Sequence, residues 1–337
     1  MKHALGSLLG GLCATLLGYC AGASEVPDAL SSGAPALTTF NDVVYLAWAG
    51  ISAVGTRKSW YATFDGTWSA QTVIPGSFTT AAPALGATTQ QLFLATTPPN
   101  TEEIDLYALE STEFSLLGPL CQGSTCAQTL AAPALLGNGA VLYAAWATPS
   151  GAIMVAQFIN GTWLIAANPI PNASADPSIG PALGIFADRL YVAWTEPSGE
   201  EISVISTALP LSSNSWSSPA VQVAARTNTA PALGVFTLFD SPPSQSLFLA
   251  WTTPASRIKF AQWNTQTAQW STVGSPIALP SGALTSLAPS LNGSVFQTPN
   301  DECFYTNNLA FTMLEPKGAI DFGHRVKHDK QNTMGCP

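Results

Sequence analysis

The stretch Ala34-Pro-Ala-Leu-Thr-Thr-Phe-Asn-Asp-Val-Val-Tyr-Leu-Ala-Trp48 decides the fold, because both of its ends recur along the chain. The opening tetrapeptide occurs five more times, either unchanged or with one substitution. The prolines of the six copies are Pro35, Pro83, Pro133, Pro181, Pro231 and Pro289. Their spacings are 48, 50, 48, 50 and 58 residues, and self-similarity at such a period indicates a repeat architecture.

The Trp that closes the quoted stretch recurs in step with the proline. Trp48, Trp146 and Trp194 each follow their proline by 13 residues. Trp251 follows Pro231 by 20 residues, which indicates an insertion at Asp240–Ser246. Thr96 and Phe311 take this place in the second and sixth copies. A side chain that recurs at one strand position in most repeats is interpreted as packing between neighbouring sheets, not as a ligand contact.

The fourth copy indicates four short strands and no helix. Leu190, Val192 and Trp194 alternate with Tyr191 and Ala193, which is the two-residue period of a strand. The four expected strands are Pro181–Phe186, Arg189–Thr195, Ile202–Thr207 and Trp216–Val223. Four strands in a repeat of this length are typical of a propeller blade.

Six copies therefore predict an all-β fold, a six-bladed β-propeller of four-stranded blades. We expect a single propeller domain over residues 24–337. The repeats lie near residues 34–81, 82–131, 132–179, 180–229, 230–287 and 288–337.

The composition excludes several classes of protein. Only 9% of the 337 residues are charged, while 47% are hydrophobic, so the chain has enough apolar side chains for a large core and is not a disordered protein. The net charge of -9 argues against nucleic acid as a partner, because binding phosphates needs a basic face.

The N-terminus has the pattern of a signal peptide over residues 1–23. Lys2 and His3 precede an apolar segment, and Ala21-Gly-Ala23 gives the small-x-small cleavage pattern. Lipoprotein processing at Cys20 is the alternative, although Tyr19 is bulky for such a site. No later window is apolar for 18 residues, so no transmembrane helix is predicted. The protein is expected to be secreted or extracytoplasmic.

Four cysteines remain after the predicted signal peptide: Cys121, Cys126, Cys303 and Cys336. An even number in an exported chain predicts two disulfides, and three pairings are possible. Cys121 with Cys126 would close a small loop, and Cys303 with Cys336 would hold the chain end. A metal site is the rival interpretation, but no His lies near the first pair in sequence. We predict no metal site and no cofactor.

The C-terminal stretch Phe322–Pro337 departs from the repeat. It is locally basic and contains no Trp to mark a fourth strand. It is interpreted as a solvated tail pinned by Cys336. Because the ring must close, either this tail or residues 24–33 is expected to supply the missing outer strand of the last blade.

The repeats resemble those of sialidase-like propellers and of fungal and bacterial propeller lectins. The resemblance rests on the quoted stretch and on Phe64-Asp-Gly-Thr-Trp68 and Phe158-Ile-Asn-Gly-Thr-Trp163, and it covers residues 34 to about 311. The last two segments are similar to degenerate Asp-boxes, with one residue missing before the glycine. In that family the box folds the hairpin between the third and fourth strands, so the resemblance implies structure and not catalysis.

An active sialidase is not expected from these residues. In that family, three arginines clamp a carboxylate beside a Tyr–Glu pair and an acid–base Asp. The chain has five arginines, and none lies in the expected motif. Other glycosidases need two carboxylates facing each other across a sugar, and no acidic residue recurs on the innermost strands.

We expect the binding residues on or near the long loops between the second and third strands, because binding residues often lie on such loops. A neutral sugar is bound by an aromatic ring together with a few polar groups. Trp60 beside Arg57 fits this requirement, as does Arg257 near Trp263, and Glu196 lies in an equivalent loop. The simpler interpretation at each position is a solvated rim.

The leading hypothesis is an exported, non-enzymatic, lectin-like propeller that binds glycans or cell-surface glycoconjugates. A protein-binding or structural propeller without a sugar site is the second hypothesis. A diverged sialidase-like glycosidase is the third.

Overall fold

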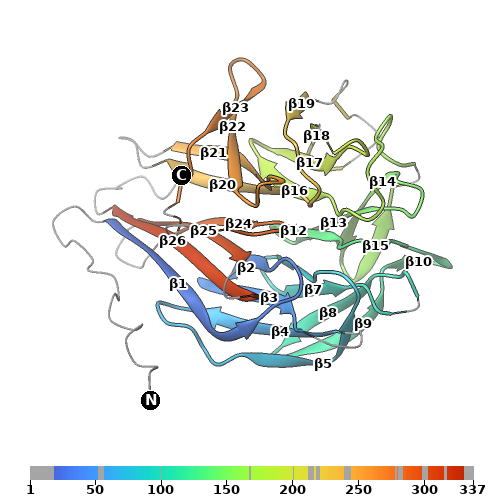
Figure 1. Ribbon diagram of the computed structural model, residues 1–337. Coiled ribbons are helices and arrows are strands. Elements are labelled where there is room, and N and C mark those ends of the chain that lie inside the picture. Colours follow the sequence, from blue (N-terminus) through green and yellow to red (C-terminus); the bar gives the residue numbers. More distant parts are fainter. Residues whose placement is uncertain are drawn as a thin grey trace.

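In the computed structural model, the described residues form strands, turns and loops with no helix. These residues are 19–51, 57–99, 101–166, 168–199, 201–211, 216–217, 221–238, 244–277, 279, 284–297, 303–314 and 317–329. Six four-stranded antiparallel sheets stand around a common axis (Figure 1). The predicted six-bladed β-propeller is confirmed.

In five blades the strands follow in chain order from the axis outward. The first blade holds β2 (Ala36–Phe40), β3 (Val43–Ala49), β4 (Arg57–Phe64) and β5 (Thr72–Thr79). The second holds β6 (Ala84–Ala87), β7 (Leu92–Thr96), β8 (Asp105–Glu110) and β9 (Glu113–Pro119). The third holds β12 (Ala134–Asn138), β13 (Val141–Ala147), β14 (Ile153–Ile159) and β15 (Thr162–Ile165).

The fourth and fifth blades follow the same strand order. The fourth holds β16 (Ala182–Phe186), β17 (Arg189–Thr195), β18 (Glu201–Ala208) and β19 (Val221–Ala224). The fifth holds β20 (Ala232–Leu238), β21 (Ser244–Thr252), β22 (Ile258–Asn264) and β23 (Gln269–Val273). The expectation that Trp216 begins the fourth strand of the fourth blade is wrong: the strand begins at Val221, and Trp216 packs against the cluster between the third and fourth blades.

The sixth blade is closed by the N-terminal segment. It holds β24 (Ser290–Gln297), β25 (Cys303–Thr312), β26 (Ala319–Asp329) and, outermost, β1 (Tyr19–Leu30). Figure 1 shows β1 and β26 side by side, although they come from opposite ends of the chain. Val26 and Ala29 of β1 are buried in the cluster that joins the sixth blade to the first. Cleavage after Ala23, which stays a prediction, would leave the segment that carries these two residues.

The interpretation of the C-terminal stretch as a solvated tail is wrong for its first part. Residues up to Asp329 belong to β26, which pairs with β25 on one side and with β1 on the other. Phe322 is buried, and its ring lies against Phe64 of the first blade. The basic character of the segment hid this strand, because its apolar residues alternate with charged ones. Residues 330–337, including Cys336, lie outside the described residues.

The repeated tetrapeptide lines the centre of the ring. The Ala-Pro-Ala-Leu copies of all six blades surround an axial cavity of about 160 Å³. Proline is tolerated here because it precedes the strand and no ladder hydrogen bond is lost. At the seam between the sixth and first blades, the hydroxyl of Ser290 accepts a hydrogen bond from the Leu37 amide at 3.0 Å. The substitution of Ala by Ser in the last copy therefore adds a link where the ring closes.

The recurrent tryptophans pack between blades, as interpreted from the sequence. Trp48, Trp146, Trp194 and Trp251 are at most 4% exposed. Each lies in a cluster with the preceding blade. Trp146, for example, packs with Ala95 and Leu106 of the second blade. This sheet-to-sheet contact is the repeating core of the propeller.

The predicted disulfide between Cys121 and Cys126 is present. It joins β10 (Cys121–Gln122) to β11 (Thr125–Cys126), a two-stranded ribbon after the second blade. The side-chain oxygen of Gln122 accepts a hydrogen bond from the Ile165 amide at 2.8 Å, which fastens the ribbon to the third blade. The pairing of Cys303 with Cys336 stays a prediction. In the described part of the chain, no helix is long and apolar enough to cross a membrane.

Candidate binding cleft between the fourth and fifth blades

The ring has two faces with different connections. The loop face carries the loops between second and third strands and the connections from one blade to the next. The hairpin face carries the turns between first and second strands and between third and fourth strands. Two cavities open where the hairpin ends of the fourth and fifth blades meet, and both are lined by Trp263 and Thr265.

The first cavity, here the Arg189 cavity, has a volume of about 410 Å³. One wall comes from the fourth blade, with Tyr191, Val204 and Ile205, and the other from the fifth blade, with Trp263 and Ala268. The apolar walls hold only a few polar groups between them. This balance is typical of small-molecule sites, where a few polar groups fix the orientation of the ligand.

Among the described residues that line this cavity, Arg189 is the one with a charge. Its Nε donates to the Ser206 hydroxyl at 3.1 Å, and its Nη2 donates to the Ser206 carbonyl oxygen at 3.4 Å. No carboxylate among the described residues forms an ion pair with it. Since a guanidinium has more N–H donors than these two bonds use, Arg189 keeps donors for a ligand.

Two aromatic side chains meet in the Arg189 cavity. The ring centroids of Tyr191 and Trp263 are 6.0 Å apart, and the two rings make an interplanar angle of 67°. The ring centroid of Trp263 also lies 5.3 Å from that of Trp270. Trp263 is only partly buried. Burial raises the pKa of Tyr191, and Arg189 nearby opposes that rise in part. The hydroxyl of Tyr191 therefore stays protonated at neutral pH.

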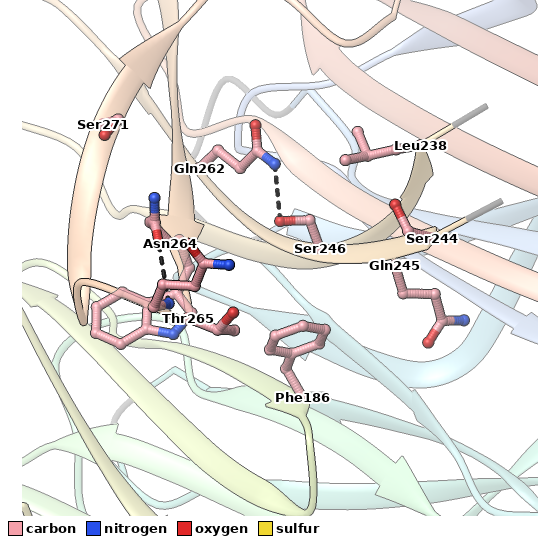
Figure 2. A pocket seen from close by; sticks show the side chains of 11 residues that line it. Phe186, Leu238, Ser244, Gln245, Ser246, Gln262, Asn264, Thr265 and Ser271 are labelled. Carbon is pink, nitrogen blue, oxygen red and sulfur yellow. Dashed lines mark hydrogen bonds between the residues drawn. The ribbon is translucent and has the colours of Figure 1, made fainter. Parts of the chain in front are cut away.

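The second cavity, here the Gln262 cavity, has a volume of about 360 Å³. None of its described lining residues, which Figure 2 shows, is charged. Gln262 Nε2 donates to the Ser246 hydroxyl at 3.1 Å. The Asn264 side-chain oxygen accepts hydrogen bonds from the amides of Gln266 and Thr267, at 2.9 and 3.1 Å, and so shapes the hairpin turn. Side-chain amides and hydroxyls dominate the lining, with Phe186 from the fourth blade as an apolar surface.

The cavities form here because the strands of the two blades differ in length at the hairpin end. In the fourth blade, β19 pairs with Glu201–Val204, and nearer the hairpin end the Ser217 amide donates to the Ser206 carbonyl oxygen at 2.7 Å. In the third blade, the outer strand pairs as far as Ile159. In the fifth blade, β20 and β21 extend to the pair Leu238 and Ser244, beyond the pair Phe186 and Arg189 of the fourth. A short blade therefore stands beside a long one.

The structure places Arg57 and Trp60 on β4, three residues apart. Arg57 donates to the Thr80 carbonyl oxygen at 3.3 Å on the loop face. Trp60 packs, partly buried, on the cluster between the sixth and first blades, opposite Trp48. A side chain at Gly50 would approach the Trp60 nitrogen to 2.8 Å, so backbone covers this part of the indole. Binding of sugar by Arg57 and Trp60 stays a prediction.

Glu196 is engaged within its own blade. Its Oε1 accepts hydrogen bonds from Trp194 Nε1, at 3.1 Å, and from the Ser203 hydroxyl. It thereby satisfies the indole N–H of one of the recurrent tryptophans. A sugar that bound Glu196 would compete with these partners, and this role also stays a prediction.

The structure does not bring Arg257 and Trp263 together. Arg257 is exposed on the loop face, just before β22, and Trp263 lies near the other end of that strand on the hairpin face. Six residues of strand separate the two Cα atoms by roughly 20 Å. The expected proximity of these two residues is therefore wrong, and Trp263 instead lines the same cavity as Arg189.

The cleft residues that sequence reasoning missed are Arg189, Tyr191, Ser206 and Gln262. One of these residues, Arg189, could have been found from the sequence by comparing equivalent positions of the blades. The equivalent residues of the other blades, from the register of the tryptophan positions, are Val43, Gln91, Val141, Ser246 and Thr306. Arg189 is the one charged residue in this set, and it lies on the hairpin face, whereas the predicted candidates were placed in loops of the other face.

The described arginines are spread over both faces of the ring. Arg57, Arg226 and Arg257 lie on the loop face of the first, fourth and fifth blades, Arg189 lies on the hairpin face of the fourth, and Arg325 lies on β26 of the sixth. In the described part of the chain, no three His, Cys, Asp or Glu side chains are arranged to hold a metal ion. The degenerate Asp-boxes form third-to-fourth-strand turns with Gly66 at φ +115° and Gly161 at φ +79°, conformations that favour glycine.

Solved structures show what this fold resembles. The Aleuria aurantia lectin in complex with Fucα1-6GlcNAc is 12% identical, with a TM-score of 0.55 over 92% of this chain and 99% of the lectin. AofleA of Arthrobotrys oligospora is 11% identical, with a TM-score of 0.63 over 94% of this chain and 91% of its own. Trypanosoma rangeli sialidase is 10% identical, with a TM-score of 0.53 over 88% of this chain and 55% of its own.

Identity at this level shows a shared fold alone, and the fold is shared by lectins and by a sialidase. The resemblance to sialidase-like and lectin propellers is thereby confirmed at the level of the fold. No protein-family model and no curated protein sequence matches the chain.

Proposed function

We propose that this protein is an exported, non-enzymatic glycan-binding propeller and that the Arg189 cavity holds sugar. The observation that carries the proposal is that Arg189 of the fourth blade and the partly buried Trp263 of the fifth line the same cavity. An aromatic ring offers a surface for the apolar face of a sugar, and N–H and O–H groups fix its hydroxyls. Ser206 and Ser217 add hydroxyls to the same cavity.

A binding role fits the cavity better than hydrolysis. Glycoside hydrolysis needs two carboxyl groups on opposite sides of the scissile bond. Neither cavity has an Asp or Glu among its described lining residues. The cleft can therefore hold a sugar, but its described residues supply neither a general acid nor a nucleophile.

Export is supported by the N-terminal pattern and by the disulfide. The Cys121–Cys126 bond is of a kind that persists in oxidising compartments. Cleavage after Ala23 would keep Val26 and Ala29, which pack into the ring seam. The mature chain would then begin with the strand that closes the propeller.

The test is a glycan array probed with the protein purified after export. The array includes α-methyl-L-fucoside and Fucα1-6GlcNAc, because a similar propeller lectin was crystallised with each of these sugars. We expect wild-type protein to bind a coherent set of sugars. Arg189→Gln, which installs the residue of the second blade, should weaken that binding by roughly tenfold or more, the value of one or two hydrogen bonds from a charged group.

Arg57→Gln is the matched control, because Arg57 lies on the loop face outside both cavities. It should leave binding unchanged, and circular dichroism should give the same β-rich spectrum for all three proteins. Loss of binding in Arg57→Gln but not in Arg189→Gln would move the site to the loop face. A folded wild-type protein that binds no sugar would refute the glycan-binding proposal.

A protein partner is the second candidate, favoured by apolar exposure on the loop face. Leu30 and Ile51, near the seam of the sixth and first blades, are 49% and 57% exposed. Side chains of this size at neighbouring surface positions are a common feature of protein contacts. Ile51→Ser would weaken such a contact and leave sugar binding unchanged.

A further inference from the structure

The two cavities at the cleft differ in chemistry but share a boundary. Trp263 and Thr265 line both of them, so the Arg189 cavity and the Gln262 cavity adjoin at these side chains. Each volume is near the lower end of the range of about 300 to 1,000 Å³ that is typical of ligand pockets. Each cavity alone suits one small unit, and the pair suits a larger ligand.

We propose that the two cavities are adjoining subsites of one site, which selects a glycan of at least two linked sugar units. This inference rests on the proposed glycan-binding function and adds the size and order of the ligand. One unit lies against Trp263 with Arg189 as its donor. The next unit, which is neutral, lies in the Gln262 cavity.

The lining of the Gln262 cavity explains why the second unit is neutral and polar. Its described side chains carry both amide and hydroxyl groups and no charge; they include Gln245, Gln262, Asn264, Gln266, Ser244 and Ser271. Amides both donate and accept hydrogen bonds, which matches the several hydroxyl groups of an uncharged sugar. An ionised group would find no opposite charge among these side chains and would lose part of its hydration.

Trp263 and Gln262 are neighbours on β22, and side chains alternate between the two faces of a strand. Trp263 packs toward Tyr191 of the fourth blade, while Gln262 reaches Ser246 of its own blade. A ligand that contacts both must therefore pass over the hairpin end of the fifth blade. Figure 2 shows Gln262 and Ser246 on one side of this cavity and Phe186 on another.

The test compares monosaccharides with the disaccharides and trisaccharides built from them. The series comprises methyl glycosides of galactose, glucose, mannose, fucose and N-acetylglucosamine and their linked di- and trisaccharides, titrated by isothermal calorimetry. We expect at least one disaccharide to bind wild-type protein roughly tenfold more tightly than either of its units, as one or two extra hydrogen bonds would give.

Two variants assign this gain to the second cavity. Gln262→Leu keeps the size of the side chain but removes the amide, and Gln245→Ala truncates an exposed side chain of the same cavity. Both should lower disaccharide affinity toward that of the monosaccharide and leave monosaccharide affinity unchanged. Arg189→Gln should weaken both. Gln157→Leu is the matched control, because Gln157 holds the position of Gln262 in the third blade and should change neither affinity.

The outcomes separate this inference from the proposed function. Equal affinity for monosaccharide and disaccharide would overturn the two-subsite site and leave glycan binding intact. Equal loss for both ligands in Gln262→Leu, with an unchanged thermal midpoint, would also overturn it. If no member of the series binds, both proposals fail.

Discussion

The junction between the second and third blades and the junction between the fourth and fifth are built from the same parts. In the first, the ring centroid of Phe158 lies 5.7 Å from that of Phe93 and 5.0 Å from that of Trp163. In the second, the equivalent contacts are those of Tyr191 with Trp263 and of Trp263 with Trp270. Both junctions thus share an aromatic ladder on the hairpin face, and the ladder alone does not make a site.

The differences lie in the backbone around the ladder. At the junction of the second and third blades, the Thr89 amide donates to the Gly139 carbonyl oxygen at 2.8 Å, so the two turns touch. Gly137 permits this approach, because a Cβ there would overlap the carbonyl oxygen of Ala87. At the junction of the fourth and fifth blades, the position of Gly137 is held by Val235. A propeller can therefore open a cleft at one junction by changing its turns while it keeps the interblade core.

The largest expected effect comes from placing the valine of the fourth–fifth junction at the equivalent glycine of the second–third junction. Gly137→Val would place a branched side chain against the Ala87 backbone, and overpacking of this kind costs about 3 kcal/mol or more. We expect a sharp fall in the free energy of unfolding, measured in urea. Val235→Gly is the counterpart and should cost less, since it leaves space instead of a clash. Equal costs for the two substitutions would refute the difference in backbone approach.

A second prediction contrasts both of these junctions with the seam that closes the ring. Asp321 of β26 is buried opposite Glu25 of β1, and its carboxylate accepts a hydrogen bond from the Phe322 amide at 2.8 Å. Burial raises the pKa of Asp321 to about 6, the amide bond opposes the rise, and Glu25 adds to it. The protonated form is therefore favoured in the folded state.

The sign of the pH effect follows from this raised pKa. The stabilising contribution is complete below the unfolded pKa of 3.8, and it is lost as the pH rises to about 6. We expect the loss to be about 2 to 3 kcal/mol, with the thermal midpoint of wild-type protein falling over that window. Asp321→Asn should flatten the profile and raise stability at pH 7. An unchanged profile in Asp321→Asn would show that other groups cause the pH dependence.

The smallest expected effect on stability comes from exchanging residues within the aromatic ladder. Trp263→Phe installs the residue of the third blade, keeps the contact with Tyr191 and should cost about 1 kcal/mol. Sugar binding should nevertheless fall roughly tenfold, because the larger indole face is lost. Phe158→Trp is the reciprocal control and should create no sugar binding. New binding in that variant would mean that the ladder, and not the open cleft, makes the site.

The blades could be predicted from the sequence because each blade carries its own copy of the repeated pattern. The Pro of the tetrapeptide, the alternating second strand and the buried Trp recur, and the six sheets follow from them. Ring closure by β1 was one of two alternatives, since pairing between distant chain ends leaves no local pattern. Asp240–Ser246 was identified as an insertion, but its consequence, the longer strands β20 and β21 beside the shorter β16 and β17, matters only once the two blades are packed together.

The candidate site was predicted less well, because it is formed between blades. Trp263 was predicted to lie near Arg257, whereas the structure places it beside the cavity that Arg189 lines, and a role in binding stays a prediction. The length of β22 already separates it from Arg257. The proximity of Arg189 follows only once the fourth and fifth blades are packed together.

The most direct test of the central claim is hydrogen–deuterium exchange of wild-type protein with and without the sugar that binds best on the array. We predict slower exchange in Arg189–Tyr191, in Ser206 and in residues 262–268, with no change in the corresponding strands of the second and third blades. Protection confined to the loop face, around Arg57 and Trp60 or around Arg257, would contradict the assignment of the site to the cleft between the fourth and fifth blades.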